Sequence, residues 1–226
     1  MENTLKKISA FIFDLDGVIT DTSEFHYRAW QHLADDEGIP FSREENEKLR
    51  GVSRLESLKL ILKGMELSED AIQILMERKN KYYVEWLESI TPKDVFPGVL
   101  LFLDELKASG IKSAIGSASK NTPMVLEKLE IGSYFDVVVD GLTIAKSKPA
   151  PDIFLKAAQN LGVLPIECVV VEDATVGIEA AQAAGMMTIG IGPVERVGKA
   201  DIVLQDFCQV HLADILSILL KETLTG

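Results

Sequence analysis

A short apolar run near the start of the chain ends on two acids. Residues 8–13 read ISAFIF, interrupted only by Ser9, and Asp14 and Asp16 follow within the sequence DLD. A run of this length and composition predicts a buried β-strand. Residues two apart in a strand share a face, so both carboxylates should lie at one rim of a sheet. Two acids placed together are costly unless a cation or a bound substrate offsets their repulsion.

The next seventy residues have a helical pattern. Four N-terminal signals predict helices, the first ending near Asp36 and the fourth near Glu88. The signals are Asp21–Glu24, Ser42–Glu45, Ser53–Glu56 and Ser68–Asp70. We therefore expect residues 20–93 to form an all-helical block.

Beyond Pro97-Gly98 the pattern changes to short β-branched runs that alternate with helical segments. The expected strands cover residues 111–117, 135–140, 168–173, 187–192 and 201–204, and helices begin near residues 99, 123, 151, 175 and 212. This alternation predicts an α/β fold with a parallel sheet covered on both faces. A connection between a strand and its helix normally takes only a few residues. We therefore predict a catalytic core, residues 1–19 and 94–226, with residues 20–93 inserted as a helical cap domain.

Composition and charge narrow the classes of partner. The chain has 226 residues, of which 47% are hydrophobic and 26% charged, and its net charge is -12. Such a field opposes contact with nucleic acid or an anionic membrane. An anionic substrate would therefore have to meet a local cluster of Lys and Arg.

The two cysteines and the apolar runs bear on the compartment. Cys168 and Cys208 do not form a metal-binding spacing, and two cysteines in a chain of this length make a disulfide framework improbable. No apolar run approaches the length of a membrane span. We expect a cytoplasmic protein without a membrane anchor.

Polar residues gather where the predicted strands end. In open α/β sheets, ligands bind at the carboxyl ends of the strands. The residues expected there are Asp14, Asp16, Ser117, Ser119, Asn121, Lys146, Lys148, Glu172 and Asp173. Several carboxylates around one point favour Mg²⁺, while hydroxyls, backbone N–H groups and a lysine favour phosphate. Together they predict phosphoryl transfer through an aspartyl-phosphate.

Each of these signals has a simpler structural explanation. A lone Asp-x-Asp is more often a turn or a helix cap than a catalytic pair. In the helical block, His26 and Trp30 lie four residues apart, a spacing typical of packing on one helix face. Arg54 could be a solvated surface residue, and Lys79 could belong to an exposed basic face with Arg78 and Lys81. The joint occurrence of the motifs at successive strand ends favours chemistry.

Four segments resemble the motifs of the haloacid dehalogenase-like phosphotransferase superfamily. They are DLDGVITDT, GSASKN, SKPAPD and VEDATVGIEAAQAAG. The segments TDTSEFHYRAW, LRGVSRLESL and RKNKYY resemble the cap of the sugar phosphomutases in that superfamily. The resemblance implies a Rossmann-like core. It also implies interconversion of β-D-glucose 1-phosphate and glucose 6-phosphate by a monomer, with Mg²⁺ and β-D-glucose 1,6-bisphosphate as the priming intermediate.

The resemblance also implies roles for individual residues. Asp14 would be the nucleophile and Asp16 the general acid/base. The proposed metal ligands are Asp14, Asp16 through its carbonyl, Asp173, and Glu172 through water. The transferring phosphate would be held by Ser117, Ala118, Asn121 and Lys148, and the distal phosphate by Arg54, with Ser119 and Lys120 in support. The remaining catalytic or sugar-binding residues would be Thr22, His26, Trp30, Gly51, Val52, Ser53, Ser57, Lys79 and Asn80.

Two other functions remain open at this stage. A phosphatase of the same fold would use the same two aspartates but would admit water to the phosphorylated Asp14. A sugar-phosphate sensor without catalysis is a further alternative, although it would have no need of a nucleophile.

Overall fold

The computed structural model describes residues 7 to 222. The first six and the last four residues, which the predicted core domain includes, lie outside the described residues. Within the described range, six strands form one parallel sheet in the order β3-β2-β1-β4-β5-β6. The strands are β1 (Ala10–Phe13), β2 (Lys112–Gly116), β3 (Val137–Val139), β4 (Cys168–Glu172), β5 (Met187–Ile191) and β6 (Ile202–Leu204).

The helices of the described chain follow the predicted order. They are α1 (Thr22–Asp36), α2 (Arg43–Glu47), α3 (Arg54–Leu62), α4 (Glu69–Leu87), α5 (Val99–Ala108), α6 (Thr122–Lys128), α7 (Asp152–Leu161), α8 (Thr175–Ala183), α9 (Val194–Val197) and α10 (Leu212–Glu222). Three 3₁₀ turns, η1 (Pro92–Asp94), η2 (Gly132–Tyr134) and η3 (Pro165–Glu167), complete the set. The short α9 and the three 3₁₀ turns were not expected from the sequence.

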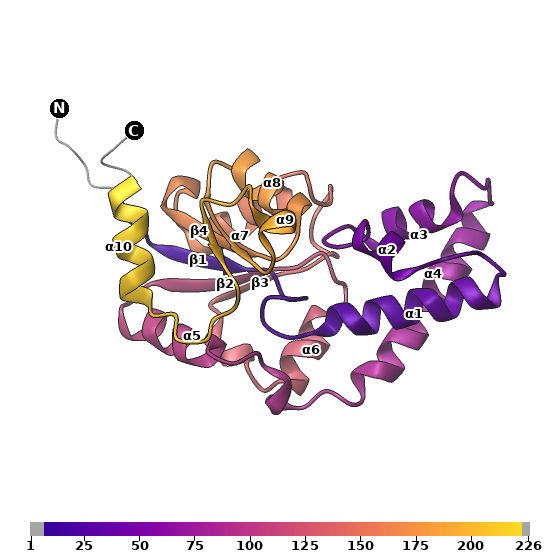
Figure 1. Cartoon of the computed structure of the whole chain (residues 1–226), viewed down its shortest axis with the longest axis horizontal. Coiled ribbons are helices and arrows are strands. Elements are labelled where there is room, and N and C mark those ends of the chain that lie inside the picture. The colour runs from indigo at the N-terminus through magenta and orange to yellow at the C-terminus, as the bar shows by residue number, and fades with distance from the viewer. Residues whose placement is uncertain (1–6, 223–226) are drawn as a thin grey trace.

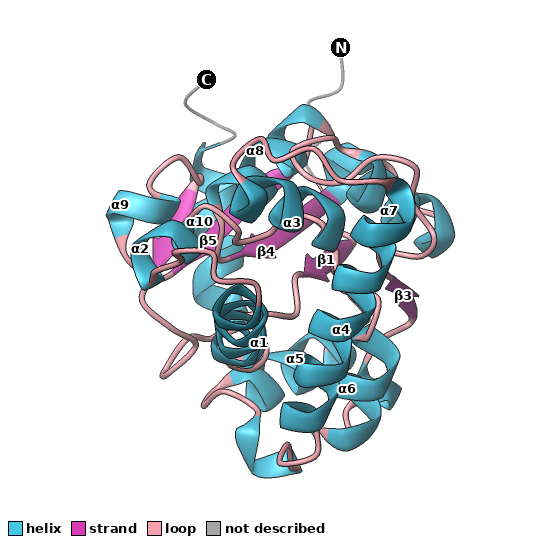
Figure 2. Ribbon diagram, turned by 90° about the vertical axis from the view of Figure 1, so that its right-hand side faces the viewer, coloured by secondary structure: helices cyan, strands magenta, loops and turns pink. Residues whose placement is uncertain are grey.

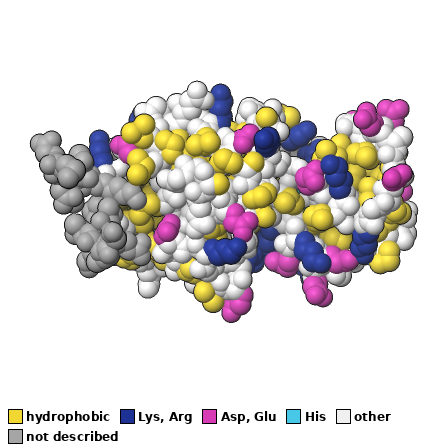
Figure 3. Space-filling view, turned by 90° about the horizontal axis from the view of Figure 1, so that it is seen from above, with side chains coloured by type: hydrophobic (Ala, Val, Ile, Leu, Met, Phe, Trp, Pro, Cys, Tyr) yellow, Lys and Arg dark blue, Asp and Glu magenta, His cyan; other side chains and the backbone are white. Residues whose placement is uncertain are grey.

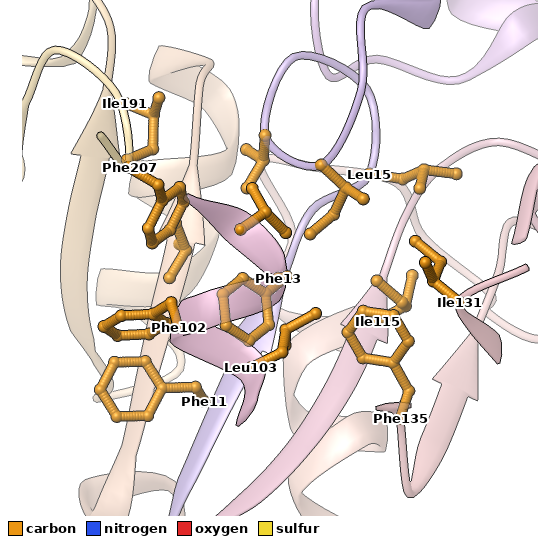
Figure 4. Packing of buried hydrophobic residues seen from close by; sticks show 14 of the residues in the cluster. Phe11, Phe13, Leu15, Phe102, Leu103, Ile115, Ile131, Phe135, Ile191 and Phe207 are labelled. Carbon is orange, nitrogen blue, oxygen red and sulfur yellow. The ribbon is translucent and has the colours of Figure 1, made fainter. Parts of the chain in front are cut away.

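Alternating residues of the strands build the two faces of the sheet. Phe11 and Phe13 point to one face, where α5, α6 and α10 cover them. There the rings of Phe102 and Phe11 lie beside each other (Figure 4). Their centres are 5.5 Å apart. Ala10 and Ile12 point to the other face, which α7 and α8 cover. Figure 2 shows the strands between these helical layers, so the predicted α/β sandwich is confirmed.

The helices α1 to α4 lie together beside the sheet, in line with its carboxyl-terminal edge (Figure 1). Three of them begin at a serine whose hydroxyl accepts a hydrogen bond from the backbone N–H three residues later, as the sequence predicts. These serines are Ser42, Ser53 and Ser68. The predicted boundaries of this cap, residues 20 and 93, stay a prediction.

The N-terminal capping interaction that the sequence predicts for α1, between Asp21 and Glu24, is wrong. The helix begins at Thr22, but the Asp21 side chain makes no capping hydrogen bond in the described structure. The carboxylate of Glu24 does not reach back to the helix start either. It binds Arg28 and Arg43 instead, which are both cations of the cap. The two arginines hold the pKa of Glu24 at about 2.

The two connections between the cap and the sheet run side by side. Thr20 and Val95 form an isolated antiparallel bridge. Beside it, the backbone N–H of Phe96 donates to the carbonyl of Ile19 at 2.9 Å, and the Thr20 hydroxyl donates to the carbonyl of Asp94 at 2.7 Å. The cap is therefore attached through one narrow two-stranded ribbon.

The surface carries mixed charge. On the face seen in Figure 3, Lys and Arg side chains are interspersed with Asp and Glu, most densely over the end of the molecule that the cap occupies. Across residues 7 to 222, we find no helix that combines the length and the apolar character needed to cross a membrane.

Candidate active site

The site lies where the strand order of the sheet reverses. The chain proceeds outward from β1 to β2 and β3 on one side, and from β4 to β5 and β6 on the other. Ligands of open α/β sheets bind in the crevice at the carboxyl ends of the two central strands. Here a cavity of about 310 Å³ opens beyond β1 and β4, between the sheet and the cap. The predicted site residues that line it are Asp14, Asp16, His26, Trp30, Gly51, Val52, Ser53, Arg54, Ser57, Lys79, Ala118, Ser119, Lys120 and Asp173.

Six predicted site residues stand behind the cavity wall instead of lining it. They are Thr22, Asn80, Ser117, Asn121, Lys148 and Glu172. Each is hydrogen-bonded to a lining residue or to another member of this group. Lys146, which the sequence placed near the site, is exposed and does not line the cavity.

A buried lysine joins the two central strands. Lys148 Nζ lies 2.5 Å from Asp14 Oδ1 and 2.6 Å from Glu172 Oε1. Burial opposes the charged form of Lys148, but the two carboxylates outweigh it and raise the pKa of this lysine. Burial nevertheless raises the pKa of Asp14 well above its usual range, against the opposing charge of Lys148. We expected Lys148 and Mg²⁺ together to keep that pKa low. In the structure, burial outweighs the effect of Lys148 on this carboxyl.

Asp16 is held on the cap side of the site. Its Oδ1 accepts a hydrogen bond from the Thr22 hydroxyl, and its Oδ2 lies 3.6 Å from His26 Nε2. Burial would raise the pKa of Asp16, but the contacts with His26 and Thr22 and the charge of Lys79 lower it overall. The side chain therefore rests as a carboxylate, ready to accept a proton.

Lys79 anchors the histidine from behind. Its Nζ lies 2.7 Å from His26 Nδ1 and 4.7 Å from the centre of the Trp30 ring. Lys79 is only 1% exposed, so the alternative that it belongs to an exposed basic face is wrong. Burial, and then the charge of Lys79, lower the pKa of His26 to about 4. Burial, followed by the charge of Arg54, lowers the pKa of Lys79 itself well below its usual range. With the Lys79 ammonium donating to Nδ1, the ring N–H of His26 lies on Nε2, facing Asp16.

Tyr83 belongs to this group, although the sequence did not point to it. Its ring stacks on His26 at 4.0 Å, and Lys79 Nζ lies 4.8 Å from its centre. Its buried hydroxyl lies near Thr22 and Ser119, without a hydrogen bond of good geometry among the described residues. Its position on α4, four residues after Lys79 and so on the same helix face, was a signal that could have found it.

Arg54 faces the cavity from the first turn of α3. Its guanidinium donates to Asn80 Oδ1 at 2.7 Å, and the side-chain amide of Asn121 donates to the same oxygen at 2.9 Å. Asn80 belongs to α4 of the cap, whereas Asn121 follows β2. One amide oxygen therefore fixes the arginine and ties the cap to the sheet. Arg54 has no carboxylate within 4 Å among the residues described.

The loop after β2 is folded by its own hydroxyls. The backbone N–H of Ser119 donates to Ser117 Oγ, and that of Asn121 donates to Ser119 Oγ, both at 3.2 Å. Ala118 and Lys120 lie between these positions and line the cavity. The expected phosphate-binding loop is therefore preformed.

Asp173 lies between two arginines that the sequence analysis did not single out. Arg50 of the cap donates to Asp173 Oδ2 at 2.9 Å, and Arg196 Nε donates to the backbone carbonyl of Asp173 at 2.7 Å. Burial, followed by the charge of Glu172, raises the pKa of Asp173 to about 7 against both arginines. The segment LRGVSR had already been singled out for its resemblance to the cap, and a second cation within it was the available signal for Arg50.

Gly51 brings the cap close to the sheet domain. Its φ is +73°, and a Cβ built there would lie 2.8 Å from Val176 and 3.1 Å from Ala174. Both neighbours follow β4. The next cap residues, Val52 and Ser53, line the cavity, while the Ser53 hydroxyl accepts a hydrogen bond from the N–H of Glu56.

The donor set fits a Mg²⁺ ion. Asp14 and Asp173 face the cavity from the ends of β1 and β4. A Cβ on Gly17 would fall 2.4 Å from Asp173 Oδ2, so only glycine lets this carboxylate approach the Asp16–Gly17 backbone. In the part of the chain that the structure describes, no three acidic, His or Cys side chains gather closely enough to hold a metal ion. Mg²⁺ usually takes one or two carboxylates and keeps several waters, so Asp14 and Asp173 are the side chains that would hold it.

Glu172 has other partners. Its Oε1 accepts from Lys148, and its Oε2 accepts from the backbone N–H of Ala174 at 2.7 Å. The side chain is fully buried. Its contact with the metal through water stays a prediction, and its observed contacts hold Lys148 in place.

Comparison with known proteins agrees with this arrangement. A family model described as haloacid dehalogenase-like hydrolase matches residues 11–191. The chain is 46% identical over 209 residues to a beta-phosphoglucomutase of Bacillus subtilis, covering 91% of this chain and 92% of that protein. It is 31% identical to a phosphorylated carbohydrates phosphatase of Thermotoga maritima, covering 96% and 100%. A crystal structure of beta-phosphoglucomutase from Clostridium difficile superposes with a TM-score of 0.93 at 40% identity, covering 97% of this chain and 100% of that one.

Proposed function

The chain belongs to the haloacid dehalogenase-like hydrolase family, and on that premise we propose that it is a β-phosphoglucomutase. It interconverts β-D-glucose 1-phosphate and glucose 6-phosphate. The reaction passes through a phosphorylated Asp14 and β-D-glucose 1,6-bisphosphate.

The position of Arg54 carries this proposal. A mutase must hold both phosphates of a bisphosphate, one at the nucleophile and one away from it. The cavity presents Asp14 on the sheet side and Arg54 on the cap side. Because Arg54 is held by a neutral amide and not by a carboxylate, its charge remains available for a phosphate. A guanidinium binds phosphate through a planar fork of donors, which suits this task better than an ammonium.

The first transfer moves a phosphoryl group from Asp14 to the sugar. The sugar oxygen O6 attacks the phosphorus on Asp14, and the Asp16 carboxylate accepts the proton of this hydroxyl. The new bond joins phosphorus to O6, and the bond to the Asp14 oxygen breaks. His26 and Thr22 hold Asp16 for this step, and the product is the bisphosphate.

The second transfer follows after the bisphosphate has turned round. The phosphate on C1 now faces Asp14, and that on C6 faces Arg54. Asp14 attacks the phosphorus, the bond to O1 breaks, and Asp16 returns its proton to O1. Glucose 6-phosphate leaves, and Asp14 is phosphorylated again.

The chain also provides for a metal and for the transferring phosphate. Asp14, Asp173 and the carbonyl of Asp16 would hold Mg²⁺, with Glu172 in contact through water. When bound, this cation neutralises negative charge on the transferring phosphate. Lys148 adds positive charge beside Asp14, and Ala118, which lines the cavity, would offer its backbone N–H to the phosphate.

A coupled assay tests the proposal. It would supply β-D-glucose 1-phosphate, Mg²⁺ and a trace of glucose 1,6-bisphosphate, and would follow glucose 6-phosphate and free phosphate together. Glucose 6-phosphate without matching phosphate release supports the mutase. Dominant phosphate release would instead support the second candidate, a sugar-phosphate phosphatase, which the similarity to the phosphatase of Thermotoga maritima favours.

The remaining expectations belong to the same proposal. The substrates are small sugar phosphates, and the protein works as a cytoplasmic monomer without nucleic acid or membrane partners. The sensor alternative is disfavoured, because the nucleophile Asp14 has both a charge partner in Lys148 and an adjacent acid/base group in Asp16. Labelling of Asp14 by beryllium fluoride and Mg²⁺ would exclude it.

A further inference from the structure

Arg50 is the residue through which the cap reaches the metal site. It lies in the turn between α2 and α3 and crosses the cavity to Asp173, where its NH1 lies 2.9 Å from Oδ2. Its Nε lies 3.0 Å from Glu47 Oε2, on its own side of the cavity. The side chain of Arg50 is 23% exposed and that of Asp173 only 5%, so this ion pair is largely shielded from solvent. Partly buried pairs are screened much less than surface pairs.

The sheet side holds Asp173 with a second arginine. Arg196 donates to the Asp173 backbone, and its NH2 lies 3.9 Å from Asp173 Oδ2. Its Nη1 lies 3.7 Å from Oε2 of Glu47, a residue of the cap. Of the two guanidinium groups beside Asp173, only Arg50 belongs to the cap. Opening of the cap therefore removes one positive charge from Asp173 and leaves the other in place.

This arrangement sets Arg50 and a divalent cation against each other. A guanidinium and Mg²⁺ repel each other at short range. A carboxylate that is paired with the guanidinium therefore binds Mg²⁺ less tightly, and a carboxylate that holds Mg²⁺ binds the guanidinium less tightly. When Arg50 and Asp173 separate, neither side chain is left without a charged partner. Arg50 keeps Glu47 as a partner within the cap, and Asp173 keeps Arg196 and gains the metal.

We propose that Arg50 and Mg²⁺ compete for Asp173, so that metal loading releases the cap while no sugar phosphate is bound. The inference rests on the metal site of the proposed function and goes beyond it. Coupling between two binding events is reciprocal. If closure through Arg50 weakens Mg²⁺ binding, then Mg²⁺ weakens closure by the same factor. The loaded enzyme stays open to substrate, and the negative charge of the sugar phosphate then draws the cap shut.

Calorimetric titration of the full chain with Mg²⁺, without sugar phosphate, tests the competition. Arg50→Gln should bind Mg²⁺ about fivefold or more tightly than the unmodified protein, the lower end of typical coupling. Arg50→Lys keeps the charge and should lie within about twofold of the unmodified protein. Arg43→Gln removes an equal charge from an exposed cap arginine, 67% exposed at its side chain, and should leave the affinity unchanged. Arg50→Met is a second neutral variant in case Arg50→Gln does not fold.

Small-angle scattering gives an independent readout. Mg²⁺ should expand the unmodified protein relative to the protein in EDTA, whereas Arg50→Gln should already be expanded in EDTA. Equal or weaker Mg²⁺ binding by Arg50→Gln and Arg50→Met would overturn the competition, and so would an unchanged radius of gyration in the unmodified protein. Asp173→Asn distinguishes an error in the metal site from an error in the competition. If the unmodified protein binds Mg²⁺ no better than Asp173→Asn, the metal site itself is wrong and the inference falls with it.

Discussion

Lys148 lies 2.5 Å from Asp14, and this contact joins the segment after β3 to the end of β1. The lysine is wholly buried and also binds Glu172, so it serves two acids at once. Its Nζ is 5.0 Å from the centre of the Phe154 ring, which belongs to the helix that covers the far face of the sheet. The proposed nucleophile, the lysine beside it and the core packing are therefore one structural unit.

Lys148→Met should impair both stability and catalysis. Removal of one partner from a buried ion pair leaves uncompensated charge and costs about 3–5 kcal/mol of the free energy of unfolding. Urea denaturation and the coupled assay would measure the two effects. Lys146→Met removes an exposed lysine two residues earlier. It should change neither the free energy of unfolding nor the activation free energy of turnover by more than about 0.5 kcal/mol. Comparable losses in both variants would contradict the assignment.

Arg54→Ala should reduce mutase turnover selectively. Charge-assisted hydrogen bonds to phosphate contribute about 1.5–3 kcal/mol each, so kcat/KM for β-D-glucose 1-phosphate should fall about 100-fold or more. Phosphorylation of Asp14 by a small phosphate donor should persist, because Arg54 lies away from the nucleophile. Arg43→Ala, in an exposed position of the cap, serves as the control. Unchanged mutase turnover in Arg54→Ala would refute the second phosphate site.

Asn80→Ala should produce a smaller loss than Arg54→Ala. Asn80 orients the guanidinium through one hydrogen bond of 2.7 Å and does not line the cavity. A typical hydrogen bond contributes about 0.5–1.5 kcal/mol, which corresponds to a loss of about three- to tenfold in kcat/KM. Asn121→Ala removes the other donor to the same oxygen and provides the comparison. A loss as large as that of Arg54→Ala would mean that Asn80 itself binds the phosphate.

The ring protons of His26 should titrate near pH 4 in an NMR experiment. Burial and Lys79 disfavour the charged ring, whereas Glu105 raises the pKa of His211 above its usual value. His26 therefore binds a proton less readily in the folded chain than in the unfolded chain. As the pH falls from about 6.5 towards 4, this difference destabilises the folded state. The chain has only three histidines, so His26→Asn and His211→Asn assign the signals. A midpoint for His26 near 6.5 would contradict its burial beside Lys79.

Gly51→Ala should hinder closure of the cap. The substitution meets Val176 at 2.8 Å and also requires a left-handed backbone, with φ at +73°. Gly38→Ala imposes similar backbone strain, with φ at +65°, but nothing lies within 4 Å of its Cβ. The left-handed backbone alone should cost each variant about 1–2 kcal/mol of the free energy of unfolding. Only Gly51→Ala should lose about tenfold or more in kcat/KM. Equal activities would show that this contact does not contribute to catalysis.

The fold was predictable because its strands are strongly apolar. The run that ends at Phe13 is buried on both faces, so its residues are hydrophobic without alternation. Each serine that begins a cap helix acts locally, through the N–H three residues later, and such signals are visible in sequence. The α9 helix has only four residues, too few for an apolar period to be recognised. Asp21 does not cap α1, and Glu24 pairs with Arg28 of the same helix and with the more distant Arg43.

The site was predictable in its residue types and less so in its pairings. Asp14, Asp16 and Asp173 stand at strand ends, where parallel topology brings them together. Arg50 was missed because its partner Asp173 is 123 residues away. The spacing of residues within the turn that holds Arg50 cannot predict a contact with so distant a residue. Lys79 illustrates the same limit, since its sequence neighbours Arg78 and Lys81 indicate an exposed face while Trp30 and His26 bury it.

The paired connections at Thr20 and Val95 have a consequence for how the molecule could be taken apart. The two ends of the cap leave the sheet side hydrogen-bonded to each other, so the 74 residues between them enter and leave at one point. Domain insertions are tolerated at such points, where the two ends of a segment lie close together. A short turn from Thr20 to Val95 would span the gap left by their removal. The segment is thus inserted at one point, and an exchange of it between relatives would have to preserve the packing of Ala29, Tyr83 and Leu87 on the core cluster of the sheet side.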